Sequence, residues 1–299
     1  MNLKQFSEEV VYLRTKNGLS QKELAKGICT QPAISKIENG EVCPQLDTLN
    51  SLALKLKVPL SHFIDIILYD NKDYIDQTIT YIEELTSRHQ YKEAYHLVKA
   101  KLTMKNQDPW FHLYLLWQRY YSGYQLKFLN ADECIEGLKQ LLLNQSIIME
   151  RFLNVRILNT IGTIYSDQRK YHESLFYYEK ILNDYSENFI NPILESKNIY
   201  ILRVIYNKAK TAYDAGNYPL AVKTVKKGIL LSIKNQNMSS IGQLYYYQGQ
   251  CYEKLNYPHD EIKTSYKQAL YFFELLGNHT YVEIIKKLKQ VYLTTEEIN

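Results

Sequence analysis

Residues 19–25 read LSQKELA and residues 31–40 read QPAISKIENG, and these two stretches decide the fold of the N-terminal part of the chain. Ser20 is a predicted helix N-cap, because Glu23 follows it by three residues and completes a capping box. Thr30 is a second predicted N-cap, at the start of the second stretch. The two caps predict two short helices in close succession.

The second stretch has an apolar face and a polar face. Pro32 falls in the first helical turn, where its missing N–H costs no hydrogen bond. Ile34 and Ile37 are spaced to point into a core, and Asn39-Gly40 is a typical helix end. Two short helices at a steep angle, the second with an exposed polar face, are typical of a helix-turn-helix. This motif makes double-stranded DNA the first candidate partner.

The remaining residues up to position 66 predict three further helices around the same core. Apolar residues spaced along one helix face precede the motif and stop near Asn17-Gly18, a natural C-cap. Pro44 precedes a fourth helix, and Pro59 introduces a fifth. The apolar residues of these three helices are Phe6, Val10, Val11, Leu13, Leu46, Leu49, Leu52, Ala53, Leu56, Phe63, Ile64, Ile66 and Ile67. We therefore expect residues 1–66 to form a five-helix DNA-binding domain of the λ-repressor kind.

The polar residues of the motif are the candidate DNA contacts. The exposed face of the second motif helix, which would enter the major groove, contains Gln31, Pro32, Ser35 and Lys36. Glutamine can pair with adenine, and lysine can donate to guanine. The N-terminus of the preceding helix, with free backbone N–H groups suited to phosphate, contains Ser20, Gln21 and Lys22. The alternative is a merely solvated helix face. Because one module buries little surface, we expect a homodimer on a palindromic, two-fold operator.

Composition is compatible with this interpretation but does not establish it. The net charge of the 299 residues is +4, and the first 40 contain six Lys and Arg against four Glu, so the chain is only weakly basic. We expect neither a membrane span nor a secretion signal, and hence a cytoplasmic protein. The four cysteines have no metal-ligand spacing and are Cys29, Cys43, Cys134 and Cys251. We expect free thiols, with a redox role for Cys29 or Cys43 as the alternative.

The rest of the chain predicts a linker and a helical repeat. Residues 67–80 are predicted to run as one linker helix, with its polar weak point, the expected hinge, at residues 70–73. From residue 81 to 299 a hairpin pattern recurs, in which a small residue, an aromatic residue and a short turn are followed by a small and then a large residue. The turns of this pattern lie near Tyr91, Tyr171, Tyr218 and Tyr257. The spacing is uneven, 47 and then 39 residues between the last three tyrosines, so we expect degenerate tetratricopeptide repeats.

Side-chain amides recur at related positions of the first helix in each predicted hairpin. Asn159 precedes Tyr165 by six residues and Asn207 precedes Tyr213 by six. Gln118 precedes Tyr124 by the same interval, and Gln243 lies about one turn earlier in its own repeat. An amide has both a donor and an acceptor, so a series of amides along a concave wall could bind an extended peptide backbone. The alternative is that each amide is an ordinary solvated residue.

The order of helix-turn-helix, linker helix and degenerate repeats resembles the Rap, Rgg, NprR, PlcR and PrgX family of peptide-responsive regulators, the PlcR type above all. The matching segments are QKEL at 21–24, SKIE at 35–38, YKE at 91–93, YNKAK at 206–210 and IGQLYY at 241–246. The resemblance implies a cytoplasmic homodimer that binds a two-fold operator. It also implies control by a small signalling peptide, as in quorum sensing, held in the concave groove of the repeats.

The resemblance further implies which residues contact the peptide. The corresponding positions here are Asn159, Asn207, Gln243 and Tyr281. PlcR-type members have lysines just before the Tyr-Lys-Glu segment that meet the peptide, whereas this chain has SRHQ at 87–90. We hypothesise that Arg88 or His89 meets a carboxylate of a different peptide.

Two other classes of function compete with this interpretation. In one, the repeats are a scaffold that binds a partner protein, and the DNA-binding role is minor. In the other, the chain is an enzyme, but no P-loop, nucleophile elbow, zinc motif or clustered His and Cys occurs. A stripe of mainly aromatic residues at helical spacing comprises Trp110, Leu113, Trp117, Tyr121 and Tyr124. This stripe could stack a cofactor, but its helical spacing favours a role in the apolar core between repeats. We therefore expect a regulator without catalysis and without a cofactor.

Overall fold

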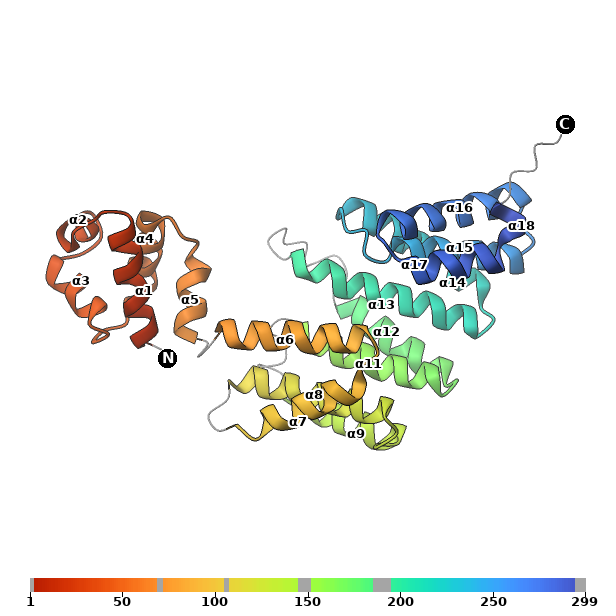
Figure 1. The fold of residues 1–299 in the computed structure, drawn as a ribbon, viewed down its shortest axis with the longest axis horizontal. Helices are drawn as coiled ribbons and strands as arrows, with labels where there is room; N and C mark the ends of the chain where they lie inside the picture. Colours follow the sequence, from red (N-terminus) through yellow and green to blue (C-terminus); the bar gives the residue numbers. More distant parts are fainter. Residues whose placement is uncertain (1–2, 69–71, 105–107, 145–151, 185–194, 294–299) are drawn as a thin grey trace. The chain divides into compact units, whose positions relative to one another are not determined.

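The computed structural model describes residues 3–68, 72–104, 108–144, 152–184 and 195–293, and the regular secondary structure within these ranges is helical (Figure 1). The chain divides into two compact units, Met1–His112 and Leu113–Asn299. This division falls inside α8 (Pro109–Gln125), and the boundaries predicted at residues 66 and 80 remain predictions. Within the described ranges, no helix combines the length and apolar character needed to cross a membrane.

The N-terminal part of the first unit has the five helices that the sequence predicts. They are α1 (Leu3–Lys16), α2 (Gln21–Ala25), α3 (Gln31–Glu38), α4 (Leu46–Leu56) and α5 (Leu60–Leu68). Ser20 and Glu23 form both hydrogen bonds of the capping box at the start of α2. The Thr30 side chain accepts a bond from the Ala33 N–H at the start of α3. These local signals alone fix where the two motif helices begin.

One apolar core holds these five helices together. The rings of Phe6 and Phe63 meet edge to face, with centroids 5.3 Å apart, and both side chains are fully buried. Leu24 and Ile34 place the two motif helices on the same core. Two of the apolar residues expected here lie outside this core. Val11 is half-buried, and Leu46, at 66% exposure, lies on the outer side of the first turn of α4.

The predicted linker falls on two helices. Its first two residues, 67 and 68, belong to α5, and residues 72–80 belong to α6 (Lys72–Ser87), which continues beyond the predicted end. Residues 69–71 lie outside the described ranges, so a single continuous helix and the hinge at 70–73 remain predictions. The helix α7 (Tyr91–Leu102) pairs with α6 as the predicted hairpin.

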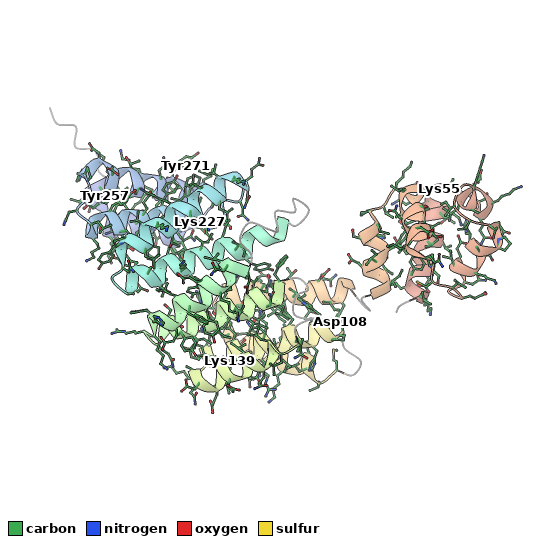
Figure 2. All side chains as sticks on the ribbon, turned by 180° about the vertical axis from the view of Figure 1, so that it is seen from behind. Lys55, Asp108, Lys139, Lys227, Tyr257 and Tyr271 are labelled. Atoms are coloured by element: carbon green, nitrogen blue, oxygen red, sulfur yellow. The ribbon has the colours of Figure 1, made fainter. Side chains whose placement is uncertain are left out.

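The second unit is a series of helical hairpins, as predicted. After α8 come α9 (Ala131–Leu141), α11 (Leu153–Asp167), α12 (Tyr171–Asp184), α13 (Glu195–Asp214), α14 (Tyr218–Lys234), α15 (Ile241–Lys254), α16 (His259–Leu275), α17 (His279–Leu288) and α18 (Gln290–Leu293). Asp108, labelled in Figure 2, caps α8 by accepting a bond from the Phe111 N–H at 2.8 Å. The first helices of successive hairpins pack on one another, α11 on α13 and α13 on α15, and so form a continuous layer.

Close glycine–tyrosine contacts set the distance between the two helices of a hairpin. A Cβ atom placed on Gly162 of α11 would lie 2.6 Å from the Tyr178 ring of α12. A Cβ atom on Gly249 of α15 would lie 2.7 Å from the Tyr266 ring of α16. Only glycine admits a ring at this distance, which explains the small-then-large pattern of the sequence.

Candidate functional site

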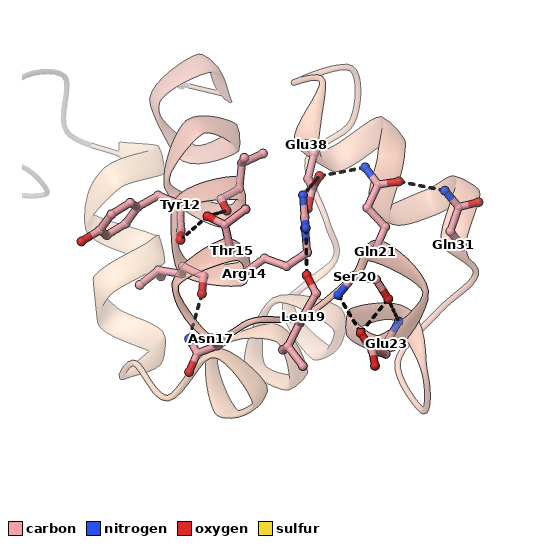
Figure 3. Close-up of polar contacts among 12 residues, drawn as sticks. Tyr12, Arg14, Thr15, Asn17, Leu19, Ser20, Gln21, Glu23, Gln31 and Glu38 are labelled. Carbon is pink, nitrogen blue, oxygen red and sulfur yellow. Dashed lines mark hydrogen bonds and ion pairs between the residues drawn. The ribbon is translucent and has the colours of Figure 1, made fainter.

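A chain of hydrogen bonds connects α1 to the two helices of the motif (Figure 3). Arg14 Nε donates to Glu38 Oε1 at 2.5 Å, and Arg14 Nη2 donates to Glu38 Oε2 at 3.1 Å. Gln21 Nε2 donates to the same Oε2 at 2.8 Å, and Gln31 Nε2 donates to Gln21 Oε1 at 2.8 Å. The Glu38 carboxylate therefore orients Gln21 directly and Gln31 through Gln21.

The centre of this network is withdrawn from solvent. The side chain of Glu38 is 4% exposed and that of Arg14 is 15% exposed. Arg14 Nη1 also donates to the carbonyl of Leu19, in the turn before α2, at 2.9 Å. A two-pronged arginine–carboxylate pair is stronger and more directional than a neutral hydrogen bond. The pair thus fixes α1, the start of α2 and the end of α3 relative to one another.

Sequence reasoning missed Arg14 and Glu38, although a signal for them exists. Arg14 follows Val10 by four residues, and Glu38 follows Ile34 by four, so each continues the core-facing side of its helix. Opposite charges at core-facing positions of two neighbouring helices indicate a buried pair, because an unpaired charge there would be costly.

The residues predicted to contact DNA lie as follows. Lys22, Gln31, Pro32 and Lys36 are exposed, and Gln21 and Ser35 are half-buried. The exposed polar side of α3 is thus the side opposite the buried Ile34 and Ile37, as expected.

Ser20 is already engaged in the cap of α2. Its Oγ donates to Glu23 Oε2 at 2.7 Å and accepts a bond from the Glu23 N–H at 3.2 Å, and its backbone N–H donates to the same carboxylate. The backbone N–H and then the hydroxyl of Ser20 lower the pKa of Glu23. A phosphate at Ser20 would therefore have to share its donors with a carboxylate.

Two of the predicted peptide-binding amides bond to each other. Asn207 Nδ2 on α13 donates to Asn159 Oδ1 on α11 at 3.0 Å. Both side chains are half-buried, and they belong to the layer of first helices. The regular spacing in the sequence thus corresponds to an actual pairing across 48 residues of chain.

Gln118 is placed differently from these two amides. Its side chain is 2% exposed, and its Nε2 donates to the hydroxyl of the buried Tyr114 at 3.3 Å. Its Oε1 has no hydrogen-bond partner among the described residues. Because Gln118 is buried, a peptide on the surface would not touch its side chain as the structure has it.

Gln243 and Tyr281 extend the candidate site toward the C-terminus. Gln243 lies half-buried on α15. Tyr281 on α17 is 43% exposed and stacks on Phe273, with ring centroids 5.0 Å apart. Burial, with a smaller contribution from Tyr281, raises the pKa of Tyr206 to about 12. The hydroxyl of Tyr206, next to Asn207 on α13, is thus a neutral donor at physiological pH.

Arg88 and His89 lie in the first unit, at the turn between α6 and α7. Arg88 pairs with Glu84 at 2.7 Å and is well exposed. His89 has a φ of +59°, and its Nδ1 lies 3.0 Å from the Tyr91 hydroxyl. Both side chains are at the surface, and their role toward a peptide stays a prediction.

The cysteines and acidic residues show no metal site within the described ranges, where no group of three His, Cys, Asp or Glu side chains converges. Burial raises the pKa values of Cys134 and Cys251 to about 12, which keeps both as thiols. Cys29 is half-buried, and Cys43 is exposed in the turn after α3.

Two family models match the chain. The model of the RNPP family C-terminal domain matches residues 79–294, and a helix-turn-helix model matches residues 11–63. A comparison with curated proteins found no match.

Solved structures similar to the chain include two of PlcR from Bacillus thuringiensis. The complex of that protein with the peptide PapR7 and DNA is 33% identical, with a TM-score of 0.85, over 94% of this chain and 98% of that one. Its apo form is 31% identical, with a TM-score of 0.68, over 94% and 99% of the two chains. The pheromone receptor Rgg2 from Streptococcus dysgalactiae shares the fold, with a TM-score of 0.66 at 14% identity over 94% and 97%.

Proposed function

The chain belongs to the RNPP family, and on this premise we propose that it is a DNA-binding transcription regulator controlled by a short signalling peptide. The observation that carries the DNA part is the bond from Gln31 to Gln21, which holds the first residue of α3 in a fixed orientation. The solved relative at 33% identity was crystallised with both a peptide and DNA. A cytoplasmic homodimer on a two-fold operator is part of the same proposal.

The geometry of Gln31 suits adenine recognition. One of its two amide N–H groups is used by Gln21, so the second N–H and the carbonyl oxygen remain for a base. Adenine presents one acceptor and one donor in the major groove, which match that pair. Lys36, on the same side of α3, is placed for guanine or phosphate, whereas Ser35 is half-buried and close to the helix surface.

The proposed peptide site is the layer of first helices α11, α13 and α15. The hydrogen bond between Asn207 and Asn159 uses an N–H of Asn207 and the carbonyl oxygen of Asn159. The N–H₂ group of Asn159 and the carbonyl oxygen of Asn207 remain for a ligand. These two groups match the C=O and N–H of an extended backbone. Gln243 and Tyr281 would continue the contact along the chain.

Control requires that the peptide bind one dimer arrangement better than another, since a ligand shifts an equilibrium only through differential affinity. We propose that an occupied groove changes the separation of the two DNA-binding domains. The active arrangement would place the two recognition helices about 34 Å apart, one turn of DNA.

DNA selected by the full chain from a random pool, followed by fluorescence anisotropy with and without peptide, tests the proposal. The peptides would be synthesised from the C-terminal ends of small secreted reading frames beside the gene. We expect tighter or looser DNA binding when one of these peptides is present, and weaker binding as salt rises. Equal DNA affinity with every peptide would exclude the switch.

Matched variants locate the two contacts. Gln31→Ala should weaken DNA binding by about 1–3 kcal/mol, the range for a two-pronged base contact, whereas Gln45→Ala, in the same domain but outside the motif helices, should not. Gln243→Ala should weaken peptide binding, whereas Gln268→Ala, an exposed glutamine on α16, should not. If each variant and its control behave alike, the assigned surfaces are wrong.

A further inference from the structure

The outward side of α14 concentrates positive charge. The helix contains four lysines and no acidic residue, and all four lysines are exposed: Lys223, Lys226, Lys227 and Lys234. The whole chain has 36 Lys and Arg against 32 Asp and Glu, so the lysines of this one helix equal its net charge of +4. The second helices of the adjacent hairpins mix the two signs, since α12 has three acidic residues and one lysine, and α16 has three acidic residues and two lysines. The charge of α14 is therefore a local feature of this helix.

Two apolar residues share the outward side of α14 with the lysines. Leu230 is 69% exposed and Ile233 is 52% exposed. With 3.6 residues per turn, the six side chains fall within about 120° of the helix circumference, on the side opposite the buried Ala221. We call the four lysines, Leu230 and Ile233 the α14 face. Leu230 lies one turn from both Lys227, labelled in Figure 2, and Lys234, so its apolar side chain lies between charges.

The charges of the α14 face are not compensated within the chain. Among the described residues, none of the four lysines forms an ion pair with a carboxylate. Lys226 Nζ instead lies 5.7 Å from the ring centroid of Tyr252 on α15. Lysines three and four residues apart on a helix repel each other and weaken it. An exposed apolar patch rimmed by polar side chains is typical of a surface that binds a partner, and here that partner has to be anionic.

The composition of the α14 face favours an acidic amphipathic helix over other anionic partners. A protein interface has an apolar centre and a polar rim, which Leu230 with Ile233 and the lysines can supply. A nucleic-acid backbone has no apolar group to cover Leu230 and Ile233. A membrane surface needs a wide apolar face, whereas two apolar side chains project here. From Lys223 to Lys234 the helix rises about 16 Å, so a partner helix of about three turns would cover the face.

We propose that the α14 face docks an acidic amphipathic helix of a partner protein. The apolar residues of that helix pack on Leu230 and Ile233, and its Asp and Glu side chains pair with the lysines. The site lies on the second helix of a hairpin and is separate from the layer of first helices α11, α13 and α15. It adds a protein partner to the DNA and the peptide of the proposed function and depends on neither.

Fluorescence anisotropy of a labelled synthetic peptide with the full-length chain tests the α14 face. The probe is about 14 residues long, four turns of helix, with leucines on one side and glutamates on the other. A scrambled peptide of the same composition keeps the charge but has no apolar side. We expect the amphipathic peptide to bind about tenfold more tightly than the scrambled one, because only the former covers Leu230. Equal affinities would overturn the inference.

Matched variants locate the binding. Leu230→Ser and the double change Lys223→Glu with Lys227→Glu should each weaken binding of the amphipathic peptide by about tenfold, through loss of an apolar anchor or opposition of like charges. Phe176→Ser and Lys180→Glu make the same kinds of change at exposed positions of α12 and should leave binding unchanged. Because all these side chains face solvent, the fold should be retained. If Leu230→Ser binds the peptide like the unmodified chain, the attraction is one of charge alone and the inference is wrong.

Vesicles containing phosphatidylglycerol and a DNA duplex without an operator test the competing anionic surfaces. We expect the affinity of the chain for either one to be the same with and without the double lysine change. A loss as large as that for the peptide would assign the α14 face to a membrane or to nucleic acid and overturn the inference.

Photo-crosslinking of the full-length chain in living host cells identifies the natural partner. Leu230 is replaced by p-benzoylphenylalanine, and the same replacement of Phe176 is the control. The expected adduct, specific to position 230, is an acidic segment with apolar residues three and four apart. An adduct with lipid, nucleic acid or a second copy of this chain, the same adduct at both positions, or no adduct would overturn the inference. The proposed function would stand in each case, because it is measured by DNA and peptide binding at other sites.

Discussion

Replacing Glu38 by glutamine should disrupt both the stability and the base preference of the DNA-binding domain. The carboxylate offers two acceptor oxygens, and Arg14 and Gln21 place three donors on them. A glutamine in its place has one acceptor and one N–H₂ group, so at least one of these donors would face another donor.

The magnitude follows from the burial of the pair. Removing one partner of a buried ion pair costs about 3–5 kcal/mol. Because the side chain of Arg14 keeps 15% of its exposure and glutamine still accepts one bond, we expect about 2 kcal/mol. Since each 1.4 kcal/mol is a factor of ten, amide hydrogens of α3 that exchange through opening of this domain should exchange about thirtyfold faster.

Hydrogen–deuterium exchange on the full-length chain measures this change, with Glu8→Gln, an exposed carboxylate on α1, as the control for the lost charge. A second selection of DNA sites measures base preference, which should relax where Gln31 contacts the operator. Exchange of α3 within about twofold of the unmodified chain would show that the pair is not stabilising. Faster exchange with an unchanged preference would show that Gln31 does not depend on Glu38 for its orientation.

Three further outcomes follow from the hairpins and the thiols. Gly162→Ala should destabilise the second unit by about 1–3 kcal/mol, because the new methyl group meets the Tyr178 ring, and a thermal melt with an unchanged midpoint would refute this. Arg169→Gly should stabilise the second unit by up to about 1 kcal/mol and so raise its melting temperature slightly, because an exposed residue with φ of +60° favours glycine; a lower midpoint contradicts it. Burial raises the pKa of the Cys134 thiol to about 12. At pH 8, Cys134 should therefore react with iodoacetamide roughly a thousandfold more slowly than the exposed Cys43. Equal labelling of the two cysteines in a peptide map would contradict this prediction.

The sequence was sufficient for features that depend on neighbouring residues. The capping box of Ser20 and Glu23 uses residues three apart, so the start of α2 was predictable without tertiary information. The hairpins were predictable for a similar reason, since Gly162 and Tyr178 lie on consecutive helices joined by a short turn. The family resemblance then covered the order of the parts, which the matches at residues 11–63 and 79–294 confirm.

Features that depend on distant residues were not predictable in the same way. Gln118 precedes Tyr124 by the same interval as Asn159 precedes Tyr165, yet Gln118 is buried and Asn159 is half-buried. The interval places a residue on a face of its own helix, but it does not show whether other parts of the fold cover that face, as they do at Gln118. Helix periodicity therefore identifies candidate contacts, and tertiary packing selects among them.

The two candidate sites share one physical device, in which an amide is oriented by an intramolecular partner before a ligand binds. Gln31 is held by Gln21, and Asn207 is held by Asn159. A side chain that is already ordered loses little rotamer freedom on binding, a cost otherwise of about 0.5–1.5 kcal/mol for each immobilised side chain. The groups left over on each amide point in fixed directions, so a ligand that does not match them leaves a polar group unsatisfied. Selectivity would then come from the orientation of these few amides more than from the area of contact.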